Sequence, residues 1–254
     1  MTEMKKLTKI FLAATIVMIS CKSEYRQLEQ VEGKRIAVDN SVQEDPKIAE
    51  FIAPYKQHLN ETLDSPLSYN PSFLSKSDGD LNTAIGNLMA DALMEQVNPV
   101  FQKNTGNSID MVLLNHGGIR AEIPVGNVST RTAYQIMPFE NEVVIAELKG
   151  EKIMEMMDYL SKAKTAHPVS GVQIIADGSY LIKNFTIQGQ QVSKDSTYFV
   201  ATSDYLVGGG DNMKFFANPV SLQSSEYKIR NVMIDYFKKT DTIRSVIDDR
   251  YIRQ

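Results

Sequence analysis

Residues 110–120 read Asp-Met-Val-Leu-Leu-Asn-His-Gly-Gly-Ile-Arg, an apolar run that opens directly into a glycine-rich loop. The run Asp110-Met-Val-Leu-Leu114 is apolar after its first residue and is bounded by residues that favour turns. A short continuous apolar run of this kind is typical of a strand that is buried on both faces. Such strands lie inside sheets that helices cover from either side, so the stretch predicts an α/β fold.

Helices and strands alternate along the rest of the chain. Helices are predicted where apolar residues recur on one face, and strands where apolar residues run together or alternate. The predicted helices follow Asp45-Pro46, run from about Thr83 to Val97, and cover 153–160 and 229–237; the predicted strands are 35–39, 110–114, 142–148, 172–176, 180–187 and 197–202. Pro54 lies inside the first helix, where we expect a kink or a break. No linker divides residues 34–254, which predicts one mixed α/β domain with a mixed sheet and flanking helices.

The composition excludes several classes of protein. The 254 residues are 43% hydrophobic and 23% charged, as in an ordinary globular protein, which excludes wholesale disorder and a multi-span membrane protein. With 27 Lys and Arg against 31 Asp and Glu, the chain has no basic excess for a nucleic-acid backbone, so polymeric nucleic acid is not an expected partner. Cys21 is the single cysteine and the three histidines are far apart, so we expect neither a disulfide nor a metal site in this chain.

The N-terminus carries the signature of an export signal. Three lysines precede the apolar run 10–20, which is too short to favour a transmembrane anchor, and Cys21 follows it. This arrangement resembles a bacterial lipobox, although Met18 and Ile19 stand where a leucine and a small residue are usual. We therefore expect residues 1–21 to be a lipoprotein signal with a lipidated Cys21, and 22–33 to be a tether; simple secretion is the alternative. The expected location is the periplasmic or cell-surface face of a bacterial membrane.

The first candidate site is the loop Asn115-His-Gly-Gly-Ile-Arg120. Gly117 and Gly118 allow backbone N–H groups to approach a ligand closely, and Arg120 can offer a planar fork to a phosphate or a carboxylate. Taken alone, the pattern fits equally well a structural turn with a surface arginine. His116 in the same loop is interpreted as a loop histidine rather than a metal ligand.

Two further loops have a composition that suits a ligand. In Ser203-Asp-Tyr-Leu-Val-Gly-Gly-Gly-Asp211, three glycines leave little side-chain bulk, and the final carboxylate can accept hydrogen bonds from vicinal hydroxyls. A flexible hairpin is the alternative. In Pro138-Phe-Glu-Asn141, an aromatic ring and an amide could meet a flat heterocycle, although the core is the favoured place for Phe139 taken alone. Together the three loops fit a phosphate, a ribose and a base.

Four motifs in succession resemble the C-terminal domain of the 5'-nucleotidase family, over roughly residues 34–250. They are Gly86-Asn-Leu-Met-Ala-Asp-Ala92, Asn115-His-Gly-Gly-Ile-Arg120, Pro138-Phe-Glu-Asn141 and Gly208-Gly-Gly-Asp211. In that family this domain binds the nucleoside part of the substrate. The resemblance implies a phosphate contact for Arg120, a base sandwich by two aromatic rings, a ribose contact for Asp211 and an amide facing the base. The implied substrate-binding residues are Asn115, Gly117, Gly118, Arg120, Phe139, Asn141, Tyr205, Gly209, Gly210 and Asp211.

The chain departs from the family pattern in two places. Family members often carry further phosphate-binding arginines where this chain has Ser75-Lys-Ser-Asp-Gly-Asp80, so Lys76 is the one cation there. The signatures of the metallophosphatase domain, which holds two metal ions in the family, are missing from the sequence. We expect no catalytic residue and no cofactor in this chain, a nucleotide or nucleoside ligand, and a separate metallophosphatase with divalent metals. The alternatives are a non-catalytic nucleotide-binding lipoprotein and a degenerate module that binds nothing.

Overall fold

The computed structural model describes residues 30–39 and 41–254; the described residues up to Glu50 belong to one unit and 51–254 to a second. The predicted signal 1–21, with Cys21, lies outside the described residues, as does most of the predicted tether. Residues 35–39 are exposed and form no strand, so that prediction was wrong. A strand needs a neighbour for its backbone N–H and C=O groups, and no described strand pairs with this segment.

Helix α2 (Pro46–Asp64) begins as the sequence predicts. The Asp45 carboxylate accepts hydrogen bonds from the backbone N–H groups of Lys47 (2.9 Å) and Ile48 (3.3 Å), which caps the helix. The helix is continuous through Pro54, so the break that we considered there does not occur. Most of its large apolar residues are exposed, and α2 has no buried residue. None of the helices in the described part of the chain combines the length and the apolar character needed to cross a bilayer.

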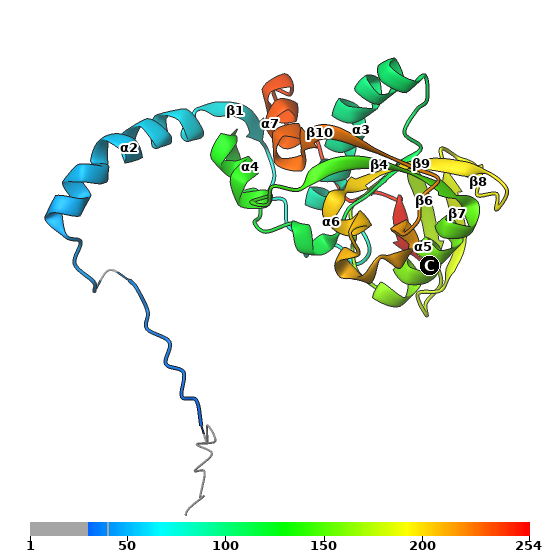
Figure 1. The fold of residues 1–254 in the computed structure, drawn as a ribbon, viewed down its shortest axis with the longest axis horizontal. Helices are drawn as coiled ribbons and strands as arrows, with labels where there is room; N and C mark the ends of the chain where they lie inside the picture. Colours follow the sequence, from blue (N-terminus) through cyan, green and yellow to red (C-terminus); the bar gives the residue numbers. More distant parts are fainter. Residues whose placement is uncertain (1–29, 40) are drawn as a thin grey trace, which may run out of the picture. The chain divides into compact units, whose positions relative to one another are not determined.

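A five-stranded mixed sheet forms the centre of the second unit (Figure 1). The strand order is β10 (Ser221–Lys228), β4 (Glu142–Lys149), β9 (Thr197–Ser203), β2 (Met111–Leu113) and β5 (Val169–Ser170). β2 and β9 are parallel, and every other pair in this sheet is antiparallel. This sheet confirms the mixed α/β prediction.

Helices cover both faces of this sheet, and the strands alternate accordingly. Along β2, Val112 packs into the core shared with α3 (Ala84–Thr105) and α7 (Ile229–Lys239), whereas Met111 and Leu113 pack into the core shared with α5 (Gly150–Ala163). In Figure 1, α3 and α7 lie above β4 and β9, and α5 lies below them. Because both faces are covered, β2 is fully buried, as its continuous apolar run predicts.

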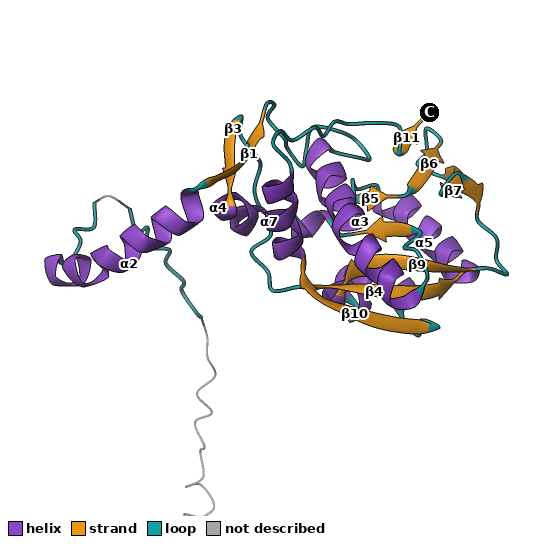
Figure 2. Ribbon diagram, turned by 90° about the horizontal axis from the view of Figure 1, so that it is seen from above, coloured by secondary structure: helices purple, strands orange, loops and turns teal. Residues whose placement is uncertain are grey.

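The remaining elements complete the second unit (Figure 2). A four-stranded sheet has the order β11 (Tyr251–Arg253), β6 (Val172–Ala176), β7 (Ile182–Ile187) and β8 (Gln190–Gln191), and a two-stranded sheet pairs β1 (Pro66–Asn70) with β3 (Gly126–Ser129). Short helices are α4 (Thr130–Ile136) and α6 (Asp204–Val207), with 3-10 turns at 116–118, 210–212 and 214–216. The predicted strands at 142–148, 172–176, 180–187 and 197–202 are confirmed, as are the later helices. The sequence analysis missed β1, β3, β5, β8, β10, β11, α4 and α6.

Candidate functional site

The topology of the central sheet brings three separate loops to one edge. β2 and β9 are parallel, so the loops that follow them leave the sheet at the same edge. β4 is antiparallel to β9, with Val143 opposite Ser203, so the segment that leads into β4 lies at this edge too. The loop after β2 begins at Asn115, the loop after β9 begins at Asp204, and 138–141 precede β4. The three glycine-rich or aromatic loops that the sequence singled out are therefore neighbours.

These loops enclose a pocket of about 320 Å³. Its lining residues are Asn115, Gly117, Gly118, Arg120, Met137, Phe139, Asn141, Tyr205 and Asp211. Eight of the ten residues named from the sequence thus meet in one cavity. Gly209 and Gly210 do not line it, and Met137, a buried residue at the end of α4, was missed. An apolar residue beside a turn carries no sequence signal that distinguishes a pocket wall from core.

Asp211 is the polar centre of the pocket. Its two carboxylate oxygens accept hydrogen bonds from Asn115 Nδ2 (2.8 Å) and from the Tyr205 hydroxyl (2.9 Å). The hydrogen bond to Asp211 raises the pKa of Tyr205 above its ordinary value. Asp211 has the left-handed backbone conformation (φ 50°), and Gly209 before it has φ 96°. This tight turn holds the carboxylate between the first and second loops.

Gly210 supports the pocket from outside its lining. A Cβ atom at this position would lie 2.4 Å from the ring of Tyr205, closer than any real contact. The aromatic ring therefore packs directly on the backbone of Gly210. Gly209, with its positive φ, allows the turn that places both residues. The two glycines shape the loop rather than contact the cavity.

Arg120 extends its guanidinium across the rim of the pocket. Its Nη1 donates to Gly117 O (3.3 Å), and the guanidinium carbon lies 5.8 Å from the centre of the Phe139 ring. The side chain is exposed, so most of its five N–H donors remain open to a ligand. Lys76 Nζ donates to Ile119 O (3.2 Å) and so lies against the same loop. The structure thus places two cations at this loop.

Two aromatic side chains of the pocket are exposed. Phe139 is 42% and Tyr205 is 47% solvent-accessible, although both belong to a residue class that is usually buried. The alternative that Phe139 belongs to the core is therefore wrong. Exposed rings in a cavity are available to stack against a flat ligand.

The sequence analysis missed Arg230, which fixes the loop that carries Phe139. Arg230 is only 4% exposed and its Nη1 donates to Pro138 O (3.4 Å) and Phe139 O (3.3 Å). It also pairs with Glu140 and lies 4.1 Å over the Tyr134 ring. Hydrogen bonds from Lys228 and Arg230 lower the pKa of Glu140 to about 2. The bonded loop is some 90 residues away in the sequence, so no local pattern pointed to this arginine.

The two histidines near the pocket have structural contacts. The backbone N–H of His116 donates to Nδ1 of His167 (3.2 Å), and Nδ1 of His116 lies 3.2 Å from Ala166 O. His167 is buried, and burial lowers its pKa to about 4. Within residues 30–39 and 41–254, no three His, Cys, Asp or Glu side chains gather closely enough to hold a metal ion.

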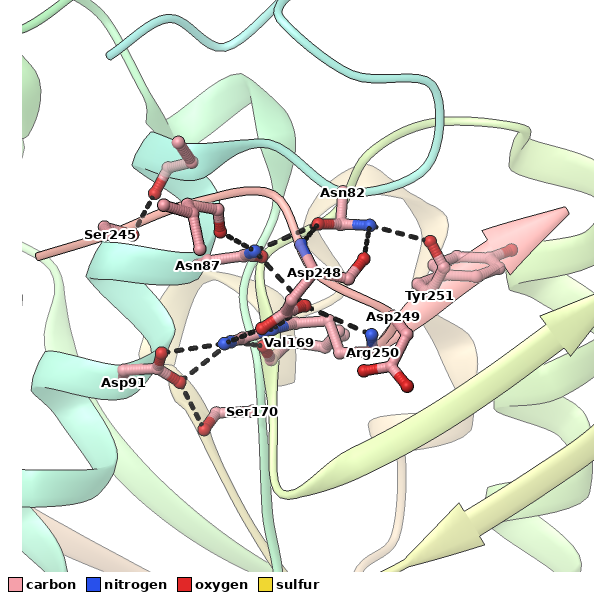
Figure 3. Close-up of polar contacts among 12 residues, drawn as sticks. Asn82, Asn87, Asp91, Val169, Ser170, Ser245, Asp248, Asp249, Arg250 and Tyr251 are labelled. Atoms are coloured by element: carbon pink, nitrogen blue, oxygen red, sulfur yellow. Dashed lines mark hydrogen bonds and ion pairs between the residues drawn. The ribbon is translucent and has the colours of Figure 1, made fainter. Parts of the chain in front are cut away.

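The motif Gly86–Ala92 lies away from the pocket and anchors the C-terminal segment (Figure 3). Asn87 Nδ2 donates to Val246 O (2.9 Å), and the Asp91 carboxylate forms a two-pronged ion pair with Arg250 at 2.8 Å for each arm. Thr83 caps the helix that presents both residues by accepting from Gly86 N. This motif supports the fold and does not line the pocket.

Comparisons with known proteins agree with this architecture. The family model described as 5'-nucleotidase, C-terminal domain, matches residues 62–218. The 5'-nucleotidase of Vibrio cholerae is 24% identical over 84% of this chain and 38% of its own length. Protein UshA of Escherichia coli is 24% identical over 85% of this chain and 38% of its own length. The chain thus spans about two fifths of these relatives.

Solved structures show the same fold. The 5'-nucleotidase precursor from Thermus thermophilus superposes with a TM-score of 0.68 and 21% identity, covering 80% of this chain and 42% of that one. The NAD nucleotidase from Haemophilus influenzae has a TM-score of 0.61 and 16% identity, covering 83% and 42%. With the family model matching more than half of the residues, the resemblance drawn from the four motifs is confirmed. The chain belongs to the 5'-nucleotidase C-terminal domain family.

Proposed function

We propose that this chain recognises a nucleotide, and that a separate metallophosphatase hydrolyses the phosphoester that the chain positions. The observation that carries the proposal is the pocket of about 320 Å³, in which two exposed aromatic rings, a carboxylate and an arginine converge from three loops. A volume of this size falls at the lower end of the range of roughly 300–1,000 Å³ for small-molecule sites. The mixture of flat apolar surface and a few polar groups suits a base, a sugar and a phosphate.

Each group in the pocket matches one part of a nucleotide. The rings of Phe139 and Tyr205 offer π surfaces for a base, and stacking tolerates different bases. Asp211, which accepts from Asn115 and Tyr205 in this structure, has lone pairs left for ribose hydroxyls. Arg120 supplies the charge-assisted donors that a phosphate requires.

The two aspartates near Lys76 have partners of their own. Asp78 accepts from the backbone N–H groups of Ser75 (3.4 Å) and Ala84 (3.3 Å). Asp80 forms an ion pair with Arg253 at 3.1 Å. These contacts partly offset the negative charge that would otherwise oppose a phosphate beside Arg120. Lys76 remains a second cation on the phosphate side of the proposed site.

The partner and the location are parts of this proposal. The relatives named 5'-nucleotidase are more than twice as long as the matched region, and no metallophosphatase signature is found in these 254 residues. The proposal places the divalent metals on a metallophosphatase that works with this chain. A lipid on Cys21 would hold the chain at an exported face of a bacterial membrane.

Replacing Arg120 with Ala tests the phosphate contact. The variant is expected to bind AMP about 10- to 150-fold more weakly than the wild type, because a hydrogen-bonded charge contact contributes about 1.5–3 kcal/mol. Binding of adenosine should barely change, because adenosine has no phosphate. The measurement is isothermal titration of both chains with AMP, UMP and adenosine.

The titration with adenosine distinguishes a phosphate contact of Arg120 from a structural role of Arg120. Equal weakening toward AMP and adenosine would mean that Arg120 supports the loop rather than the phosphate. No binding of AMP, UMP or adenosine by the wild type would overturn the proposed function itself. Arg244, which lies outside the pocket, provides a matched Arg→Ala control for the loss of one positive charge.

Two substitutions at Tyr205 separate stacking from hydrogen bonding. Tyr205→Ala is expected to weaken adenosine binding by about 1–3 kcal/mol, roughly 5- to 150-fold, because the stacked ring is lost. Tyr205→Phe keeps the ring and removes only the hydrogen bond to Asp211, so its effect should stay below about tenfold. Fluorescence or calorimetric titration checks both. Similar losses for the two variants would assign the role of Tyr205 to its hydroxyl.

The second candidate function is a lipoprotein that binds nucleotides or nucleosides without chemistry. The observation that favours it is the small number of cations at the proposed phosphate position. Arg120 and Lys76 lie there, whereas the family pattern implies a larger set of arginines. An assay with a metallophosphatase encoded by a neighbouring gene distinguishes the two candidate functions. Faster release of phosphate from AMP when the chain is added to that enzyme supports the first function, and no change supports the second.

A further inference from the structure

Asn141, which lines the pocket, is held by a neighbour that does not line it. Asn141 directly precedes β4, and Asp204 is the first residue of α6, directly after β9. Val143 and Ser203 are opposite each other in the antiparallel pair of β4 and β9. Asn141 and Asp204 therefore meet at the edge of the sheet. The Asn141 side chain donates from Nδ2 to Asp204 Oδ1 at 3.0 Å.

Backbone groups fix the carboxylate that receives this bond. Asp204 Oδ1 also accepts from the backbone N–H of Glu142 (3.1 Å) and from that of Tyr205 (2.7 Å). These two donors belong to β4 and α6, so the carboxylate bridges two elements of the pocket wall. Its position does not depend on the flexible side chain that it holds.

This contact decides which end of the Asn141 amide faces the pocket. At neutral pH a carboxylate is an acceptor only, so it bonds the NH₂ group and not the carbonyl oxygen of an amide. The nitrogen and oxygen of an asparagine are assigned from such partners. With Nδ2 directed at Asp204, the oxygen Oδ1 is directed away from it, and no donor within the described residues bonds Oδ1. Asn141 therefore presents a hydrogen-bond acceptor, its Oδ1, to the pocket.

We propose that Asp204 is a specificity-determining residue, which turns the Asn141 amide so that its carbonyl oxygen selects bases with an exocyclic amine. Adenine carries an amine at position 6, where hypoxanthine carries a carbonyl oxygen. At position 6, the oxygen of Asn141 can accept from the amine of adenine and is repelled by the carbonyl oxygen of hypoxanthine. This inference rests on the proposed function, because it names the class of base that the same pocket takes.

A purely structural role for Asp204 makes a different prediction. As the first residue of α6, Asp204 could serve only to tie α6 to β4 through the two backbone contacts. Its replacement would then change stability, or weaken all ligands alike. The ratio of the affinities for AMP and IMP is insensitive to such a role, because the two nucleotides share ribose, phosphate and stacking surface.

The experiment compares AMP with IMP on the full chain and on Asp204→Asn. The wild type is expected to bind AMP roughly tenfold more tightly than IMP, the effect of about one hydrogen bond. In Asp204→Asn the new amide can accept for the backbone donors, yet it can also donate, so Asn141 is free to turn and the ratio should fall toward one. Asp195→Asn removes the same charge at an exposed position outside the pocket and should keep the tenfold ratio.

The outcomes are separable from those that test the proposed function. If the wild type binds both nucleotides but with equal affinity, or IMP more tightly, this inference is overturned while the function stands. An unchanged ratio in Asp204→Asn overturns it too. If Asp204→Asn binds neither nucleotide, Asn141→Ala is measured instead. A ratio of AMP to IMP affinity near one supports selection by the Asn141 carbonyl oxygen, and a retained tenfold preference for AMP overturns the inference.

Discussion

Replacement of Arg250 with Ala is expected to lower the free energy of unfolding by about 2–3 kcal/mol, because a largely buried guanidinium loses charge-assisted hydrogen bonds to Asp91 and Asp248, whose own side chains are 46% and 35% exposed. The Arg250 side chain is only 15% exposed, and its guanidinium bonds Asp91, Asp248 and Val169 O. The bonds to Asp91 measure 2.8 Å each, and that of Nη2 to Asp248 measures 2.7 Å. Without the arginine, two carboxylates face each other with no cation between them.

The effect should be structural and remote from the ligand. Asp91 belongs to α3, whereas Arg250 precedes β11, the outermost strand of the four-stranded sheet (Figure 3). The ion pair therefore fastens the C-terminal strand to the central helix. Asn82 adds to this attachment by donating to Tyr251 O at 2.8 Å. Loss of the pair should release β11, and the pocket, which Arg250 does not line, should bind as before once the chain is folded.

Denaturant titration of the wild type and Arg250→Ala measures this difference. Arg131→Ala is the matched control, because Arg131 also makes a two-pronged pair, with Asp64, but both side chains are well exposed (38% and 50%). An exposed pair contributes about 0–1 kcal/mol, so the control should lose little. Similar small losses for the two variants would contradict a fastening role for Arg250.

The family could be predicted from sequence because its motifs are local. The strand 110–114 and the glycines after it follow each other directly, and the remaining motifs recur in order. Their meeting in one pocket follows from the parallel pairing of β2 with β9 and the antiparallel pairing of β4 with β9. No motif specifies that pairing, and the sequence analysis did not predict it.

Elements without an apolar pattern escaped the sequence analysis. β10 reads Ser-Leu-Gln-Ser-Ser-Glu-Tyr-Lys, and it is an edge strand that pairs with β4 alone. An edge strand with mostly polar residues has no periodicity that separates it from a loop. The opposite error occurred at 35–39, where an apolar run has no strand to pair with. Strand formation depends on a partner that the local sequence does not contain.

Residues that position the site were missed for a related reason. Asp204 and Arg230 act on residues 63 and about 90 positions away, across the antiparallel sheet and from the start of α7. Neither has a spacing that marks it, and a surface role would explain each residue in the sequence alone. By contrast, the residues that line the pocket sit in loops whose glycines and aromatics are unusual in themselves.

Stability of the second unit is expected to fall by on the order of 3 kcal/mol as the pH drops from about 6.5 to about 4, through protonation of His167. Burial lowers the pKa of this imidazole to about 4 in the folded chain, whereas the unfolded chain has the ordinary value of 6.5. Between these two pKa values, His167 is protonated in the unfolded state and neutral in the folded state. The contribution is therefore complete above pH 6.5 and is lost progressively toward pH 4.

The groups around His167 explain why the neutral form is retained. The negative charge of Asp211 favours protonation, but burial and the neighbouring His116 oppose it, and burial dominates. Nδ1 of His167 also accepts from the backbone N–H of His116, the second residue of the loop that carries Arg120. A proton on Nδ1 would remove this acceptor and leave a backbone donor unpaired. Acid should thus loosen the loop 115–120 as well as the fold.

Denaturant titrations of the wild type and His167→Gln between pH 4 and 7.5 test this account. Glutamine does not titrate and can accept from the His116 N–H, so the variant should be less stable at pH 7.5 but should lose much less stability toward pH 4. Carboxylates that titrate near pH 4 act on both chains alike, so the difference between the two profiles isolates His167. His58 is exposed, and His58→Gln should leave the profile unchanged. If the wild type and His167→Gln decline in parallel, the pH dependence arises from the carboxylates and the buried histidine does not control it.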